Sequence, residues 1–234
     1  MVIANMTNEE LIRQYHQIYH MAEDGSWPNI NKHGLLSTSA LLMMYGYKGS
    51  ERTAIESECR TSKKTISCDG YEDVVIRDQK VMPPEDLEKC LLGGMTPQEW
   101  YEYINRRIFF WVKKERLEWF LGAREYRNEP HLVITVDTRS LLKRYAGLVT
   151  LTNMNTGSTI YDRERYDRPR LRGKETFRTI KEYPYYAVGS IVELVVEDGI
   201  PDIADITICV ARWIAHKKGY EGPNYEKLED VWSV

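Results

Sequence analysis

The sequence predicts a single α+β domain, and three observations lead to this prediction. Short apolar runs rich in β-branched and aromatic residues indicate strands. Caps and prolines at first helical positions indicate helices between these runs. The 234 residues are 42% hydrophobic and include six Trp and sixteen Tyr, enough for a packed core. We therefore expect one domain over residues 1–234, with a core at about 16–210 and a C-terminal tail at 211–234, whose polar part from Lys217 is expected to be loosely packed.

The first half of the chain predicts short helices and two short strands. Capping boxes begin helices at Thr7 and Thr96, and Pro83 begins another. Thr38 or Ser39 is expected to cap a further helix. The expected strands are 17–22 and 74–76, and the expected helices carry Leu11, Ile12 and Tyr15; Trp27 to His33; Leu41, Leu42 and Met43; Leu87, Cys90 and Leu91; and Trp100, Tyr103 and Ile104.

The second half of the chain predicts most of the strands. The expected strands are 108–112, 131–136, 148–151, 190–196 and 205–210, with helices at 113–121 and from a cap at Asp137 or Thr138 to Tyr145. Residues 153–186 form the longest irregular stretch, and such loops are usually functional, so this is a candidate substrate loop. The stretch contains a run of arginines among aromatic residues: Arg163, Arg165, Arg168, Arg170 and Arg172.

Arginines beside aromatic residues are typical of sites that bind phosphate and stack on bases, whereas the acidic residues between them favour a solvated surface.

The composition narrows the classes of function. A formal charge of −3 removes the electrostatic argument for nucleic acid that a basic domain would give. Four cysteines without CxxC spacing predict free thiols in a reducing cytosol. No segment has the pattern of a signal peptide or a membrane span, so we expect a cytoplasmic protein without a membrane partner. His16 and His20 lack the HExxH context of a zinc site, and no metal is predicted.

One carboxylate stands in the apolar run from Ser190 to Val196. Ile191, Glu193 and Val195 share one face of a two-residue repeat, so Glu193 points where its apolar neighbours point. Burial of an unpaired carboxylate is costly. We therefore expect Glu193 to be paired, protonated or lining a cavity, and a structural ion pair would also explain it.

Three elements occur in an order that resembles the ADP-ribosyltransferase superfamily. They are a strand with His20 followed by Gly34-Leu35-Leu36-Ser37, the aromatic strand Ile108-Phe109-Phe110-Trp111, and the strand with Glu193. Within this superfamily the chain resembles DarT-type nucleic-acid ADP-ribosyltransferases, where a Val/Ile-Pro turn closely follows the glutamate strand, as Ile200-Pro201 follows Glu193 here. It also resembles an uncharacterised bacterial family with Gly-Leu-Leu-Ser, Phe-Phe-Trp and Pro-Asp-Ile-Ala-Asp motifs.

The resemblance implies two packed, mainly antiparallel sheets with flanking helices and an NAD site across three strands. It implies an NAD-dependent transferase, a glycosyltransferase that cleaves the nicotinamide bond and passes ADP-ribose to an unidentified nucleic acid or protein. Glu193 and His20 would be catalytic. NAD would be held by His20, Leu36, Ser37, Thr38, Arg77, Arg107, Phe109 and Phe110, with either phenylalanine stacking on nicotinamide and either arginine on pyrophosphate.

Two departures and two alternatives accompany this resemblance. A phenylalanine replaces the usual second-strand tyrosine, and Ile191 stands where the arginine-modifying subclass has Glu or Gln. The first alternative is a non-catalytic NAD-binding or protein-interaction module with the same fold. The second is an RNA 2′-phosphotransferase-like enzyme, which would need a basic cluster. The residues also allow plain structural roles, with His20 in the core, Ser37 and Thr38 as caps, and Arg77 and Arg107 at the surface.

Overall fold

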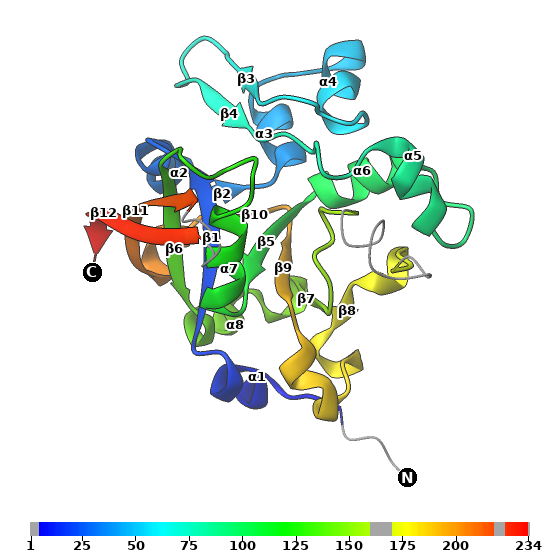
Figure 1. Cartoon of the computed structure of the whole chain (residues 1–234), viewed down its shortest axis with the longest axis vertical. Helices are drawn as coiled ribbons and strands as arrows, with labels where there is room; N and C mark the ends of the chain where they lie inside the picture. Colours follow the sequence, from blue (N-terminus) through cyan, green and yellow to red (C-terminus); the bar gives the residue numbers. More distant parts are fainter. Residues whose placement is uncertain (1–4, 160–169, 218–222, 234) are drawn as a thin grey trace.

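One large antiparallel sheet organises the chain. The computed structural model describes residues 5–159, 170–217 and 223–233. The sheet has eight strands in the spatial order β12-β11-β6-β1-β5-β9-β7-β8 (Figure 1). These strands are β1 (Gln17–Glu23), β5 (Arg107–Trp111), β6 (His131–Asp137), β7 (Val149–Thr152), β8 (Arg178–Thr179), β9 (Glu193–Glu197), β11 (Thr207–Lys217) and β12 (Pro223–Ser233). The predicted mixture of helices and antiparallel strands is confirmed.

The two halves of the sheet meet at one point. In the described chain, β1 pairs with β5 at Tyr19 and Trp111 alone, whereas β1 pairs with β6, and β5 with β9, along their whole lengths. This single backbone link joins the halves β12-β11-β6-β1 and β5-β9-β7-β8. The strand order joins both halves in one sheet, so the expected arrangement of two packed sheets is not confirmed. Two small sheets, β2 (Leu35–Leu36) with β10 (Gly199–Ile200) and β3 (Lys64–Ile66) with β4 (Val74–Ile76), lie beside the large one.

Helices cover both faces of the large sheet. The α-helices are α1 (Asn8–Gln14), α2 (Trp27–His33), α3 (Thr38–Met44), α4 (Gly49–Glu56), α5 (Pro84–Leu87), α6 (Pro97–Asn105), α7 (Lys114–Leu121) and α8 (Thr138–Tyr145). One face carries Ile18, Phe110 and Leu194 and packs against α1 and α8. The other face carries Val133, which packs on α7, and Val195, which packs on α6. Apolar side chains therefore cover both faces of the central strands.

Short 3₁₀ turns occupy several of the connections. They are η1 (Glu88–Cys90), η2 (Ala146–Leu148), η3 (Lys174–Thr176), η4 (Ile180–Glu182), η5 (Tyr185–Ser190) and η6 (Ile203–Ile206). The described parts of the predicted irregular stretch, 153–159 and 170–186, contain η3, η4, the start of η5 and β8. Residues 160–169 of that stretch, with Arg163, Arg165 and Arg168, lie outside the described residues.

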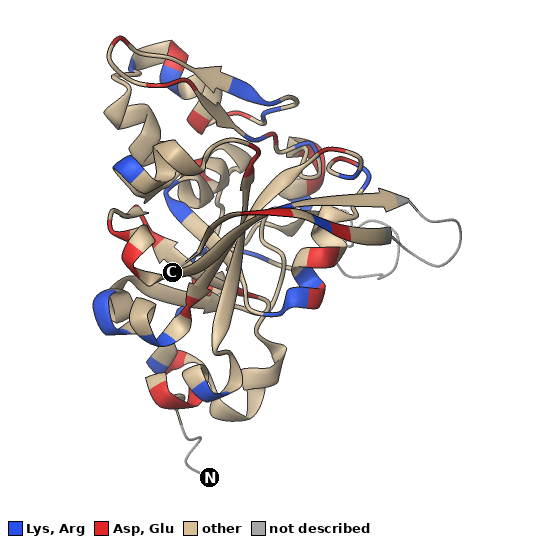
Figure 2. Cartoon of the chain, turned by 90° about the vertical axis from the view of Figure 1, so that its left-hand side faces the viewer, with Lys and Arg blue, Asp and Glu red and all other residues tan. Residues whose placement is uncertain are grey.

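The C-terminal tail is a strand, and the prediction of a loosely packed tail is wrong. β12 pairs with β11 almost from end to end, and Trp232 packs on Trp27 with ring centroids 5.3 Å apart. Acidic and basic residues are spread along this ribbon (Figure 2). The sequence signal is weak because the strand is mostly exposed and polar, and backbone pairing with β11 supplies its order.

Smaller differences concern caps and strand ends. Both capping boxes are present, at Thr7 and Thr96, and Asp137 caps α8 as predicted. Ser37, rather than Thr38 or Ser39, caps α3, because its Oγ accepts the backbone N–H of Ala40 at 3.2 Å. The last predicted strand begins at Thr207 and runs on to Lys217, since η6 occupies the residues before it.

Gly34 joins the α2–α3 segment to the end of the glutamate strand. The pair β2–β10 aligns Leu35 with Ile200 and Leu36 with Gly199. Gly34 has φ +90°, and a Cβ at this position would lie 2.5 Å from Pro201 Cα and 2.8 Å from the Ile200 carbonyl oxygen. Both atoms belong to rigid backbone, so glycine is required here for its conformation and for its size. The Gly-Leu-Leu-Ser motif therefore packs on the turn that follows β9.

No α-helix in the described parts of the chain combines the length and the apolar character that crossing a membrane requires.

The substitution Gly34→Ala tests this junction against a matched control. Gly46 also has positive φ, at +76°, but no atom lies within 4 Å of its added Cβ. Gly46→Ala is expected to cost about 1–2 kcal/mol of unfolding free energy for the left-handed backbone alone. Gly34→Ala should cost about 1–3 kcal/mol more, because the added Cβ meets Pro201 and because φ +90° with ψ 166° is a conformation almost confined to glycine. Urea denaturation of both variants measures the difference, and equal losses would contradict the close approach to Pro201.

Candidate functional site

The two halves of the large sheet part at a cavity. Because Tyr19 pairs with Trp111 in antiparallel register, residues 20–23 of β1 face residues 107–110 of β5 beyond that pair. The strands have no further pairing there in the described chain, and a cavity of about 460 Å³ lies in this region. His20 to Glu23 and Arg107 to Phe109 line it. This volume is within the range of small-molecule sites, about 300–1,000 Å³.

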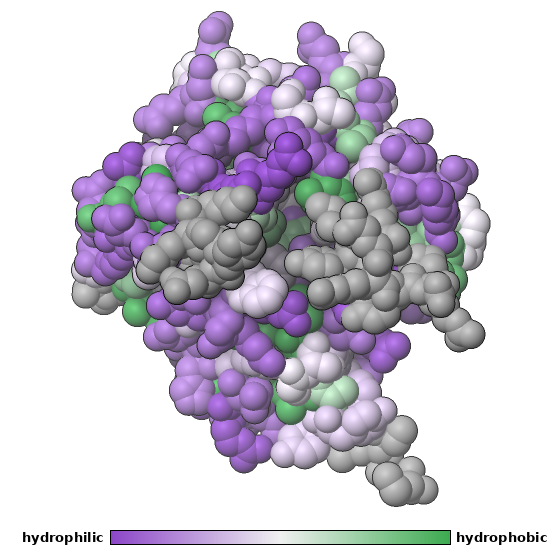
Figure 3. Space-filling model, viewed as in Figure 1, coloured by the Kyte–Doolittle hydropathy of each residue, from purple (hydrophilic) through white to green (hydrophobic). Residues whose placement is uncertain are grey.

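Several other segments complete the wall of the cavity. They are the α2–β2–α3 region, the β3–β4 hairpin with Arg77, the side chains Phe120 and Tyr126, the turn Asn155–Gly157, and Glu193. The face shown in Figure 3 is mostly hydrophilic, and apolar residues show in a hollow near its centre. The cavity thus combines apolar lining residues with charged groups of both signs, and polar groups in a largely apolar pocket are typical of ligand sites.

Glu193 begins β9 and is 3% exposed. Thr156 donates its hydroxyl to Oε2 at 2.8 Å and its backbone N–H to the same oxygen at 3.3 Å. Burial raises the pKa of Glu193 to about 8, although the hydrogen bonds from Thr156 and the charge of Arg172 oppose this rise. The carboxyl group is therefore largely protonated at pH 7. It also lines the cavity and has a partner, so the three outcomes expected from its apolar strand occur together.

His20 lies on β1, in the same cavity. Its Nδ1 is 2.9 Å from the carbonyl oxygen of Phe109. A carbonyl oxygen accepts only, so Nδ1 carries the proton and Nε2 is left as an acceptor. Burial lowers the pKa of His20 to about 4. The positive charge of Arg77 lowers this pKa further, whereas the hydrogen bond to Phe109 opposes the decrease. The ring is therefore neutral at pH 7, and Nε2 suits a hydroxyl donor.

The two phenylalanines of β5 lie on opposite faces of the sheet. Phe109 is half-buried, lines the cavity and packs near Phe177 with ring centroids 6.2 Å apart. Phe110 is fully buried in the core and tilts against the His20 ring at 5.6 Å. Phe109 is among the residues that line the cavity, whereas Phe110 is not. Phe110 as a nicotinamide-stacking residue is wrong, and Phe109 stays a candidate.

Leu36, Ser37 and Thr38 line the cavity at the junction of β2 and α3. Ser37 is 2% exposed, and its backbone N–H donates to the Asp198 carbonyl at 2.8 Å, just past β9. Because its Oγ is the cap of α3, Ser37 has the structural role that the sequence left open. The backbone bond also fixes this wall relative to Glu193.

The two candidate arginines are held in different ways. Arg77 donates Nη1 to the Met21 carbonyl at 3.4 Å, and its guanidinium lies 4.3 Å from the ring centre of Tyr126. Arg107 lies 3.7 Å from the ring centre of Tyr103 and pairs with Glu197 at 3.6 Å. Both line the cavity, but the Arg107 guanidinium is engaged by α6 and β9. The geometry favours Arg77 as the group that meets a ligand anion.

Three cavity residues have a buried polar atom without a hydrogen-bond partner in the described chain. These atoms are Oε2 of Glu23, Nδ2 of Asn29 and Nη2 of Arg77. A buried polar atom left unpaired costs about 1–3 kcal/mol. A ligand with both donors and acceptors would satisfy them. Glu23 and Asn29 were not predicted from sequence, since neither stands in a recognisable motif.

Thr156 was also missed, although it lies in the stretch predicted as a substrate loop. A threonine among Asn, Thr and Gly residues gives no sequence signal for a contact with a glutamate 37 residues away. The contact depends on the turn at 155–157, where Gly157 N–H donates to Asn155 Oδ1 at 3.1 Å. Asn side chains form such turns with their own backbone, and that propensity is the available signal.

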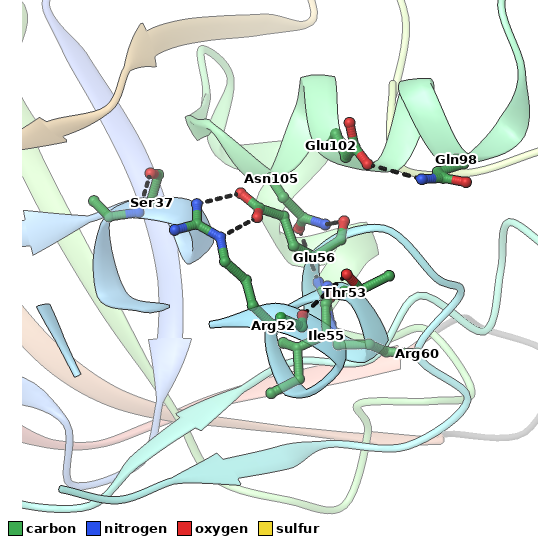
Figure 4. A network of polar contacts seen from close by, with 11 residues as sticks. Ser37, Arg52, Thr53, Ile55, Glu56, Arg60, Gln98, Glu102 and Asn105 are labelled. Atoms are coloured by element: carbon green, nitrogen blue, oxygen red, sulfur yellow. Dashed lines mark hydrogen bonds and ion pairs between the residues drawn. The ribbon is translucent and has the colours of Figure 1, made fainter. Parts of the chain in front are cut away.

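A polar network that includes the cavity-lining residues Arg60 and Asn105 is hydrogen-bonded within the protein. Arg60 Nη2 donates to Asn105 Oδ1 at 3.1 Å, and Asn105 Nδ2 donates to the Glu56 carbonyl at 2.7 Å (Figure 4). Glu56 also pairs with Arg52. These residues join α4 to α6, so we interpret them as structural. Among the described residues, no group of three or more His, Cys, Asp or Glu side chains is arranged to hold a metal ion.

The raised pKa of Glu193 gives a test through stability. Between about pH 4.5 and 8, the native protein holds a proton that the unfolded chain has lost, so stability falls as pH rises. Glu193→Gln removes this dependence and keeps an acceptor for Thr156. Its unfolding free energy relative to wild type should grow by up to about 1.4 kcal/mol per pH unit. Urea denaturation from pH 5 to 8 measures it, and a constant difference would contradict the raised pKa.

Comparisons with known proteins identify the family of this chain. A search of the curated proteins found no match. A scan against protein-family models matches residues 16–207 to a family of unknown function, DUF7002. The match spans the sheet from just before β1 to the start of β11, and so contains every cavity residue named above. The chain therefore belongs to the DUF7002 family.

Proposed function

We propose that this protein is an NAD-dependent ADP-ribosyltransferase. It would break the bond between nicotinamide and ribose and transfer ADP-ribose to an acceptor. The observation that carries the proposal is that Glu193, His20 and Phe109 open into one cavity from three neighbouring strands, β9, β1 and β5. An acid, a neutral imidazole and an aromatic ring on adjacent strands are what the sequence resemblance to ADP-ribosyltransferases requires.

The chemistry needs few groups from the protein. Nicotinamide in NAD⁺ is a cationic leaving group, so the bond breaks with its electron pair passing to the nicotinamide nitrogen. The ribose carbon left behind carries positive charge, and a carboxylate beside it stabilises that charge. In this arrangement the Glu193 carboxylate accepts a hydrogen bond from the ribose 2′-hydroxyl. It then takes the proton that the attacking acceptor group releases. His20 Nε2 accepts a hydrogen bond from a second ribose hydroxyl, and the ring of Phe109 stacks on nicotinamide.

Arg77 is the proposed partner of the pyrophosphate. Its guanidinium is fixed by Met21 and Tyr126, while Nη2 has no hydrogen-bond partner among the described residues. A preorganised guanidinium pairs well with phosphate oxygens because its planar fork matches their spacing. Burial strengthens that attraction by excluding water.

The protonated state of Glu193 sets the pH at which this reaction runs. The free protein holds a neutral carboxyl group at pH 7, whereas the reaction needs the carboxylate. Cationic nicotinamide in the same cavity favours ionisation, since an opposite charge lowers the pKa of an acid. A second candidate function is a non-catalytic NAD-binding module. The neutral carboxyl group favours it, because a protein that only binds NAD does not need an ionised Glu193.

The acceptor is proposed to be a nucleic acid or a protein. RNA 2′-phosphotransferase-like chemistry is the weaker alternative, because it needs arginines free to meet a phosphate. Arg172 is 1% exposed and bonded to backbone carbonyls, so it is turned away from solvent. Arg163, Arg165 and Arg168 lie outside the described residues.

Glu193→Gln should abolish catalysis and spare binding. We expect nicotinamide release to fall by about 10²- to 10⁴-fold, because the amide neither stabilises positive charge nor takes a proton. In the wild type, kcat/KM should rise about tenfold per pH unit and level off near pH 8, the pKa of the free protein. NAD binding to the variant by calorimetry is the control. Binding by wild type without nicotinamide release would support the silent module instead.

Arg77→Gln should weaken NAD binding rather than chemistry. Loss of a charged hydrogen-bond donor costs about 1.5–3 kcal/mol, which corresponds to about 10- to 150-fold in Kd. Arg139→Gln is the matched control, since Arg139 is exposed and pairs with Glu9 outside the cavity. Calorimetry with NAD compares the two variants. An unchanged Kd for Arg77→Gln would remove Arg77 from the site.

A further inference from the structure

The carboxyl group of Glu193 is held by a turn that no strand of the sheet provides. Thr156 is fully buried, and its hydroxyl proton is directed to Glu193 Oε2 at 2.8 Å. Its backbone N–H is shared between the two carboxyl oxygens, at 3.3 and 3.4 Å. The short hydroxyl bond is therefore the stronger of the contacts that fix the direction of the carboxyl group.

We propose that Thr156 is a positioning residue for Glu193, and that buried Arg172 fixes Thr156 in turn. This inference rests on the proposed function, in which Glu193 is the catalytic acid. Thr156 would not touch the reacting atoms. It would aim the Glu193 carboxyl group and favour its ionised form, because a donor bonded to a carboxylate stabilises the charged state.

Arg172 holds the turn from behind. Its Nη1 donates to the carbonyl oxygens of Ser158 at 3.1 Å and Thr156 at 3.4 Å. Its own backbone bonds to Cys90 and Leu92, so the guanidinium starts from an anchored chain. A buried arginine on backbone carbonyls is costly to place, and it fixes the turn at one distance from β9.

The far end of the turn is anchored as well. The backbone N–H and the hydroxyl of Thr159 both donate to the Val81 carbonyl, at 2.9 and 3.2 Å. The segment from Asn155 to Thr159 is therefore held on Glu193, Arg172 and Val81. Hydrogen bonds at these three places hold the backbone of the segment, and so fix the position of the Thr156 side chain.

Among the groups around Glu193, Thr156 and Arg172 have the main influence on the ionisation of its carboxyl group. Its register partners, Trp111 on β5 and Thr152 on β7, carry no charge. Arg172 is the charged residue that acts on its pKa within the described chain, and His20, neutral at pH 7, lines the same cavity. The other charged cavity residues are Glu23, Asp24, Arg60, Glu72, Asp73, Arg77 and Arg107. Removal of the Thr156 hydroxyl should therefore show directly in the titration of Glu193.

The test compares Thr156→Val with Thr156→Ser by carbon NMR of labelled glutamate side chains. Glu193→Gln assigns the Glu193 signal by its absence. We expect the valine variant to raise the titration midpoint of Glu193 by about 1 to 2 pH units, since a charge-assisted hydrogen bond is lost. The serine variant keeps the hydroxyl and should titrate like wild type. Equal midpoints in all three proteins would overturn the proposal.

Two further measurements keep the result decisive. Thr156→Ala removes the hydroxyl without adding a methyl group against the carboxyl, and it should give the same rise if the valine variant does not fold. With NAD, the alkaline shift should appear in the pH profile of nicotinamide release, with kcat reduced and KM little changed. A shifted titration without any nicotinamide release would leave the positioning role standing and reject the proposed function.

Discussion

The parting of β1 from β5 is the constraint on which the rest of the site depends. Strands that separate leave backbone groups without ladder partners, and such groups must be satisfied when they are buried. The Nδ1–H of His20 supplies one replacement, because it donates to the carbonyl oxygen of Phe109 across the gap. That bond fixes the tautomer of His20 and turns Nε2 into an acceptor. The same hydrogen bond that satisfies a backbone carbonyl in the gap of the sheet therefore leaves His20 Nε2 able to accept a hydrogen bond from a ligand.

The second constraint is the burial of Glu193 at the end of the same gap. An acid in an apolar strand is costly when ionised, and the Thr156 turn and Arg172 offset part of that cost. The protein therefore carries a proton on this acid that a cationic ligand can displace. Gly34 and the β2–β10 pair tie the opposite wall to the end of β9, so the two sides of the cavity are fixed relative to each other.

Sequence reasoning found the elements that carry their own signal. Strands with continuous apolar runs, such as that of Glu193, and helices with capping boxes, such as that of Thr96, were predictable because the signal is local. The polar strand β12 was missed since its order comes from pairing with β11. The resemblance assigned roles to His20, to Phe109 or Phe110, and to Glu193, and the common cavity of His20, Phe109 and Glu193 depends on strand register. Thr156 and Arg172 act through long-range contacts that no local pattern encodes.

A crystal structure of the Glu193→Gln variant with NAD tests the central claim most directly, because the variant should bind NAD without consuming it. We expect the nicotinamide ribose between residue 193 and His20, within hydrogen-bond distance of both, nicotinamide against Phe109, and the pyrophosphate at Arg77. NAD bound outside this cavity, or a cavity left empty at saturating NAD, would contradict the proposed function.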